Sequence, residues 1–252
     1  MPSSPSTPDK LLDAAEQLFA DNGYHGVPVR AITQAAGTRL AAINDHFGGK
    51  EKLFQAVVAR RAGLINEDRE RLLCQAEPVT EGADGLASIT EAFARPLLTR
   101  SQDSDGWRNY LRLTAQLSTM RSTVLLLIAD QFDAVAQRFM AAIGTAVPAL
   151  DERQRGLAYQ LMVASTMGVF SDNLRINVLT GNRFLSSDFA SHYADLIGYV
   201  TGGILGLAQV RSGPERPEAP RPRGESNQQR RLRLRRRTVA ALERLRSAGT
   251  SG

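Results

Sequence analysis

Apolar residues recur along most of this chain at the spacing of one buried face of an α-helix. In the segment 7–22, Leu11, Ala15, Leu18 and Phe19 follow the i, i+4, i+7, i+8 pattern. Alternating apolar and polar runs bounded by turn residues, which would predict strands, do not recur along the sequence. The pattern therefore predicts an all-α fold.

Four helices are expected near the start of the chain, and glycines mark their ends. Thr7 is expected to cap the first helix, with Pro8 at its first position, and Asn22-Gly23 is expected to end it. The next three helices are expected at 28–35, 38–46 and 50–74, with a bend at Gly37 and a stop at Gly48-Gly49.

Longer helices are expected through the middle of the chain, at 85–100, 104–119, 122–146, 151–179 and 187–209. Polar and glycine-containing segments at 103–106 and 180–182, together with Pro148, supply the breaks. We therefore expect a small N-terminal helical domain at 7–54, after a disordered segment at 1–6, and a larger helical domain at 55–210.

The last segment, 211–252, differs in composition from the rest. It holds 12 arginines and 4 acids, a net charge of +8, whereas residues 1–210 carry a net charge of −3. Four prolines within 213–225, and no aliphatic residue larger than alanine, predict a disordered tail there. The segment 228–247 is expected either to form a short basic helix or to stay disordered. The basic character of the chain thus comes from this tail.

The remaining composition favours a cytoplasmic protein. A single cysteine, Cys74, excludes an internal disulfide and fits a reducing compartment. The N-terminus lacks the basic start and apolar run of a signal peptide. The longest late uncharged run, 196–210, has 15 residues, whereas a membrane span needs roughly 20. No membrane partner is expected.

The second and third helices, joined by a glycine turn, form a helix-turn-helix pattern. A DNA major groove admits one α-helix, and two turns of helix span the few base pairs that such a helix reads. The following helix begins with Lys50, so its free N–H groups and the lysine charge are expected to face phosphates.

Three stretches in this order resemble the DNA-binding domain of the tetracycline-repressor (TetR) family of bacterial regulators. They are LLDAAEQLFADNGY, VRAITQAAG and AAINDHFGGKEKLF, within residues 11–54. The resemblance implies an all-α homodimer with a larger C-terminal domain for ligand binding and dimerisation. It also implies a double-stranded DNA operator and a small apolar effector as partners. No cofactor and no metal are expected.

The same resemblance assigns ten positions to the DNA interface. Five of them, Arg30, Arg39, Leu40, Ala41 and Ala42, are expected near base edges or adjacent phosphates. The others are Thr38, a helix cap, Asn44, His46 and Lys50, directed to phosphates, and Asp45. Asp45 departs from the aromatic residue common in the family. It accepts a hydrogen bond from cytosine, pairs with a neighbouring arginine such as Arg39, or weakens DNA binding.

Candidate ligand and dimer residues lie in the larger domain. For the ligand they are Trp107, Tyr110, Leu117, Met120, Phe139, Met162, Ser165, Thr166, Phe170 and Asn173, although core packing is the competing role for each apolar residue. Gly198, Gly202 and Gly206 share one face of the last helix. Because each glycine costs about 1 kcal/mol of helix propensity, their register predicts close helix contact, between subunits or within one.

Catalysis is not expected. The histidines, His25, His46 and His192, are far apart and lack metal-ligand spacing. The sequence favours a ligand-responsive, homodimeric repressor that binds a pseudo-palindromic operator. The alternative is non-specific binding of nucleic acid or an acidic partner through the arginine-rich segment 230–237.

Overall fold

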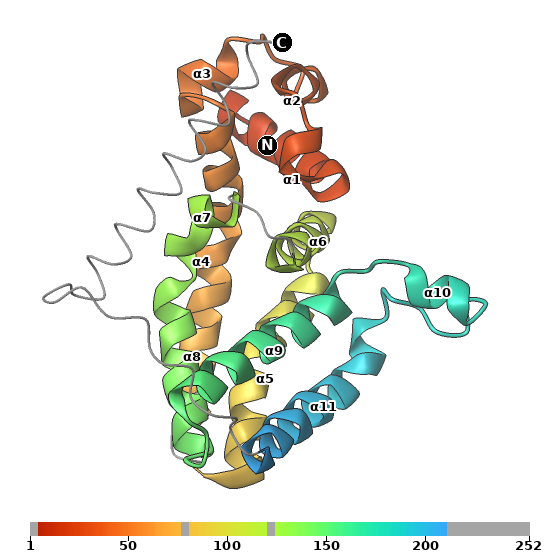
Figure 1. Ribbon diagram of the computed structural model, residues 1–252. Helices are drawn as coiled ribbons and strands as arrows, with labels where there is room; N and C mark the ends of the chain where they lie inside the picture. The colour runs from red at the N-terminus through yellow and green to blue at the C-terminus, as the bar shows by residue number, and fades with distance from the viewer. Residues whose placement is uncertain (1–4, 77–80, 120–123, 211–252) are drawn as a thin grey trace, which may run out of the picture.

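The computed structural model describes residues 5–76, 81–119 and 124–210, and all regular secondary structure in these ranges is helical (Figure 1). The predicted fold class is therefore confirmed. At one end of the molecule lie α1 (Thr7–Gly26), α2 (Val29–Ala35) and α3 (Ala42–Phe47). The long helix α4 (Lys50–Ala76) leaves this group and runs along the molecule. The predicted tail, 211–252, and residues 1–4 lie outside the described residues.

The first helix begins one residue earlier than predicted. Ser6, and not Thr7, is the N-cap, because its hydroxyl accepts from the backbone N–H of Asp9 while the Asp9 carboxylate accepts from the backbone of Ser6. Gly23 interrupts the helical geometry with φ +67°, close to the predicted end. A further turn of helix follows it.

The third helix is shorter than predicted, and Thr38 does not cap it. Residues 38–41 form an irregular segment and a turn, in which the N–H of Ala42 bonds to the carbonyl of Arg39 at 3.0 Å. The Thr38 hydroxyl points back to the carbonyl of Thr33. The predicted stop is confirmed, since Gly48 and Gly49 have φ values of +72° and +133°.

Two predicted long helices are each broken into shorter pieces. The first break coincides with hydrogen bonds from residues remote in sequence, and the second with residues of positive φ. In place of 122–146 the chain forms α7 (Val124–Ile128), a 3₁₀ turn (Ala129–Gln131) and α8 (Asp133–Ala146). Side-chain amides of α4 bind carbonyls at this break: Gln55 donates to Leu127 and Asn66 to Gln131. These bonds replace those of a continuous helix.

The predicted helix 151–179 ends early, as α9 (Glu152–Phe170). Asp172 and Leu174 then have φ values of +45° and +60°, which end the helix, and a separate short α10 (Arg175–Leu179) follows. The Ser186 hydroxyl donates to the Asp172 carboxylate at 2.5 Å. This hydrogen bond joins the two ends of the segment that contains α10. Figure 1 shows α10 projecting from the helical body.

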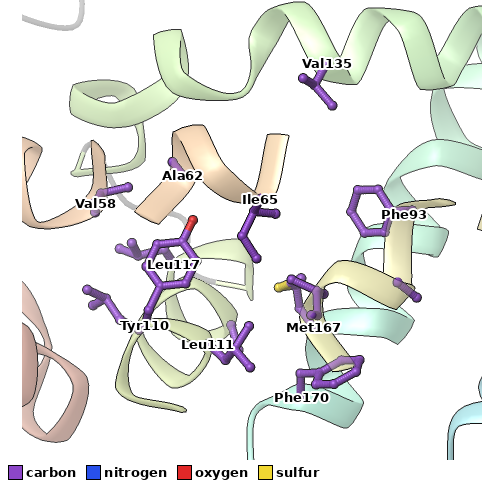
Figure 2. Packing of buried hydrophobic residues seen from close by; sticks show 14 of the residues in the cluster. Val58, Ala62, Ile65, Phe93, Tyr110, Leu111, Leu117, Val135, Met167 and Phe170 are labelled. Atoms are coloured by element: carbon purple, nitrogen blue, oxygen red, sulfur yellow. The ribbon is translucent and has the colours of Figure 1, made fainter. Parts of the chain in front are cut away.

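The remaining helices pack on α4 or on one another. These are α5 (Gly82–Ser101), α6 (Asp105–Thr119) and α11 (Phe189–Gln209). α5 packs on α4, α6 lies between α1 and α9, and α11 packs on α5 and α9. The buried apolar residues form one cluster with members from α1 to α11. Figure 2 shows part of it, with residues of α4, α5, α6, α8 and α9. None of the described helices is long and apolar enough to cross a membrane.

Candidate DNA interface and ligand cavity

Most predicted DNA-contacting side chains lie exposed around α3. They are Arg30, Arg39, Leu40, Ala41, Asn44, Asp45 and His46. Ala42 is an exception, because it is only 3% exposed and packs in the domain core with Ile43. The assignment of Ala42 to base edges is therefore wrong. The turn before α3 places Leu40 and Ala41, and not Ala42, on the outer surface.

Asp45 pairs with Arg39 on this surface. The Arg39 Nη2 atom lies 2.8 Å from the Asp45 carboxylate, and both side chains are largely exposed. Of the three roles considered for Asp45, the structure shows the arginine pair in the unbound chain. An exposed ion pair contributes roughly 0–1 kcal/mol, so Arg39 can exchange this partner for a phosphate or a base.

The Lys50 ammonium is partly buried and lies close to two aromatic rings, although the residue begins a helix. Its Nζ atom lies 4.5 Å from the centroid of the Tyr24 ring and 5.9 Å from that of Phe19. Partial burial lowers the pKa of its ammonium. Sequence reasoning missed Tyr24, which sets the position of this lysine, and Lys52, which is exposed on the same helical turn beside Gly48.

A buried ion cluster joins α1 to α4. Glu16 is 2% exposed, and its carboxylate accepts hydrogen bonds from Arg61 at 2.6 and 2.7 Å. Arg60 lies 3.0 Å from the same carboxylate and 2.7 Å from Asp13. The Arg61 guanidinium also lies over the ring of Trp107, 4.7 Å from its centroid. The first helix, α1, is thus fixed to the long helix α4.

The larger domain contains an apolar cavity of about 290 Å³. Five helices contribute its lining, together with Phe132, which follows the 3₁₀ turn. The lining includes Ile65, Arg69, Phe93, Tyr110, Leu117, Phe132, Tyr159, Val163 and Met167. Figure 2 shows Tyr110 and Leu117 of α6, Ile65 of α4, Phe93 of α5 and Met167 of α9 around this region. Of the predicted ligand residues, Tyr110 and Leu117 line the cavity.

Most other ligand assignments are not supported by this geometry. Phe139 packs edge-on against Phe93, and Phe170 packs against Phe189. Trp107, Met162 and Thr166 are also buried away from the cavity lining. Ser165 and Asn173 line a different, more open hollow near α10. Met120 lies outside the described residues. At these buried apolar positions the side chains therefore pack in the core and do not line the cavity.

Arg69 is the charged residue among the several lining residues that sequence reasoning missed. It is 5% exposed and lies on the buried face of α4, one turn after Ile65 and one turn before Leu73. The sequence alone could have indicated this residue, because an arginine at an i, i+4 position between apolar residues is rarely buried unless it has a partner.

The three glycines of α11 face outward. Among the residues that the structure describes, an added Cβ at Gly198, Gly202 or Gly206 would meet no atom within 4 Å. Packing against these residues therefore does not explain the three glycines. Tyr199 on the same surface is 71% exposed, and Leu161 on the neighbouring α9 is 47% exposed.

Two family models match the two parts of the chain. Residues 11–57 match the model described as bacterial regulatory proteins of the tetR family, and residues 91–203 match the tetracyclin repressor-like C-terminal domain. The HTH-type transcriptional regulator UidR of Escherichia coli (strain K12) is 25% identical over 174 residues, covering 66% of this chain and 81% of that protein. The HTH-type transcriptional repressor AcnR of Corynebacterium efficiens is 36% identical over 110 residues, covering 44% and 50%.

Solved structures of the same fold agree with this assignment. FadR from Bacillus subtilis, solved in complex with stearoyl-CoA, has a TM-score of 0.54 at 17% identity, covering 77% of this chain and 97% of that one. FadR from Bacillus halodurans has a TM-score of 0.53 at 20% identity, covering 80% and 97%. With the helix-turn-helix geometry and both domain matches, the chain belongs to the TetR family of DNA-binding transcriptional regulators.

Proposed function

We propose that this regulator is a homodimeric repressor that leaves a pseudo-palindromic operator when a small, largely apolar effector fills the cavity. Two copies of α3, about one DNA turn apart, would read the two half-sites. The observation that carries the proposal is that two of the helices lining the cavity, α4 and α6, also contact the end of the molecule formed by α1, α2 and α3, which is called the DNA-binding end below.

The first such connection is α6. Its inner face contributes Tyr110 and Leu117 to the cavity. On its other side, Gln116 donates to the carbonyl of Ala20 at 2.6 Å, and Arg112 lies 2.8 Å from Asp21. A change in cavity contents that moves α6 would therefore move α1 as well.

The second connection is α4. Ile65 and Arg69 line the cavity, while Lys50 begins the same helix at the DNA-binding end. The 15 residues from Lys50 to Ile65 span about 22 Å at the rise of an α-helix. The Glu16–Arg61 pair transmits a tilt of this helix to α1. An effector shifts the population of the two states only by its difference in affinity for them.

Dimerisation through α9 and α11 is supported by the outward glycine face and by the exposed Leu161 and Tyr199. Glycines allow two helices to approach closely, and large exposed apolar side chains gather at subunit contacts. This surface would set the distance between the two DNA-binding ends.

The test begins with selection of an operator from random duplexes and measurement of the stoichiometry of the complex. Apolar compounds that raise the melting temperature of the protein should weaken operator binding. Val163→Trp should abolish this response by filling the cavity, whereas Leu64→Trp, exposed on α4 away from the cavity, should retain it. A monomeric complex, or cavity ligands that leave operator affinity unchanged, would refute the proposal.

A further inference from the structure

The cavity wall holds a buried cation. The Arg69 side chain is held from one side by α5: its Nε atom donates to the carbonyl of Phe93 at 3.0 Å, and its guanidinium carbon lies 3.8 Å from the centroid of the Phe93 ring. Burial lowers the pKa of Arg69 to about 10, which still leaves the guanidinium protonated at neutral pH. The cavity wall therefore carries a positive charge at neutral pH.

This charge lacks a counter-ion in the described part of the chain. Arg69 forms none of the ion pairs seen there, and its buried Nη2 atom has no hydrogen-bond partner. Elsewhere the partly buried Arg60, Arg61 and Arg100 each pair with a carboxylate, whereas the partly buried Arg155 donates to the Leu150 carbonyl. An unpaired buried ion carries a desolvation cost of several kcal/mol. Packing alone does not account for an arginine here, because a methionine would fill the same space without that cost.

Two phenols stand with Arg69 at the cavity surface, Tyr110 of α6 and Tyr159 of α9. Its positive charge partly offsets the rise that burial causes in the pKa of both phenols, so both lie within its field. Burial still raises the pKa of Tyr110 far above its usual value, and the neutral hydroxyl remains a donor. The nearby Thr114 and Ser118 hydroxyls donate to backbone carbonyls of their own helix.

We propose that the effector is a compact monocarboxylate, whose carboxylate pairs with Arg69 and accepts from the Tyr110 hydroxyl while its apolar body fills the rest of the cavity. The guanidinium fork matches a carboxylate with two hydrogen bonds. A single cation balances one negative charge, so a phosphate dianion would leave a charge uncompensated. The inference rests on the proposed function, which makes this cavity the effector site.

The cavity also limits the size of the acid. Its volume of about 290 Å³ lies just below the usual range for ligand sites, roughly 300–1,000 Å³. Apart from the donors named above, the lining is chiefly aliphatic and aromatic, with Ile65, Leu97, Leu117 and Met167 among its members. Short alkyl or single-ring acids suit this space.

The experiment compares acids with amides of the same shape, using the full-length protein at neutral pH. Octanoate and 3-phenylpropanoate are titrated by calorimetry against octanamide and 3-phenylpropanamide. The acids should bind at least tenfold more tightly, since a hydrogen bond to a charged group contributes about 1.5–3 kcal/mol. Arg69→Met should remove this preference, leave amide binding unchanged, and raise the melting temperature of the free protein because the unpaired charge is gone.

Two further variants keep the outcome interpretable. Arg69→Lys retains the charge without the fork and should keep a reduced preference for acids, which also covers the case of a poorly folded Arg69→Met protein. Arg100→Met removes an arginine that pairs with Asp68 and does not line the cavity. It should lower stability but retain the preference.

Equal binding of acids and amides, full acid binding by Arg69→Met, or no binding of either acid at 10 mM would overturn the inference. Neutral ligands of the same shape that bind the cavity more tightly than the acids would overturn it too, while the proposed function stands. An acid that binds through Arg69 but leaves operator affinity unchanged would instead refute the proposed function.

Discussion

Gly106 offers a sharp test of the ion cluster that joins α1 to α4. A Cβ added at Gly106 would lie 2.3 Å from the Nη2 atom of Arg61 and 3.0 Å from the Oε2 atom of Glu16. A guanidinium at the end of a free side chain would simply move away. Here it is held by two hydrogen bonds to Glu16 and by the ring of Trp107. Gly106→Ala should therefore separate the pair.

The expected magnitude follows from two opposing contributions. Replacing a helical glycine by alanine stabilises by at most about 1 kcal/mol. Removing one partner of a buried ion pair costs about 3–5 kcal/mol, and the loss here is smaller because Arg60 remains 3.0 Å from Glu16. Taken together, these contributions give a net loss of roughly 2 kcal/mol for Gly106→Ala.

Urea unfolding of the full-length protein, at fixed protein concentration, measures this change. Gly63→Ala is the matched control, since Gly63 lies within α4 and an added Cβ there meets nothing within 4 Å. It should stabilise by about 0.5–1 kcal/mol. In an Arg61→Ala background, Gly106→Ala should become stabilising, because the guanidinium that the new Cβ would meet is gone. If Gly106→Ala stabilises the unmodified chain as much as Gly63→Ala does, the cluster does not constrain Arg61 and the account of this junction is wrong.

Three other predictions concern the surfaces proposed to bind DNA and a second subunit. Arg39→Ala and Lys50→Ala should each weaken operator binding about tenfold or more without unfolding the protein, and fluorescence anisotropy that shows unchanged affinity would refute the interface. Asp45→Asn should tighten binding to every operator variant alike, because it removes a negative charge and frees Arg39; a loss confined to one base position would indicate base reading instead. Gly202→Leu, which meets open space in the single chain, should leave the helix folded but lower the dimer content seen by light scattering, and an intact dimer would exclude this face.

The DNA-binding end was predictable because its signals are local. The positions of Gly37, Gly48 and Gly49 require positive φ, and all three adopt it. The buried spacing of Leu11, Ala15 and Phe19 is likewise visible in the sequence and in the core. Ala42 was misassigned because the turn before α3 rotates the helix by an amount that no local pattern records.

The larger domain was predictable as a set of helices but not in its breaks or its cavity. The break after Ile128 depends on Gln55 and Asn66, more than 60 residues away. The cavity depends on where five helices leave space, so periodicity identifies its apolar liners as core without distinguishing Leu117 from Phe139. Arg69 interrupts the apolar i, i+4 spacing of α4. A residue that departs from such a pattern indicates a functional site better than the apolar residues around it do.

The central claim, that the cavity controls DNA binding, is tested most directly by linked titrations. The operator affinity of the full-length protein is measured with and without a saturating cavity ligand, and the ligand affinity with and without operator. The account predicts that both affinities fall by the same factor, about tenfold or more, because coupling between two sites is reciprocal. An operator affinity that does not change when the cavity is filled would contradict it.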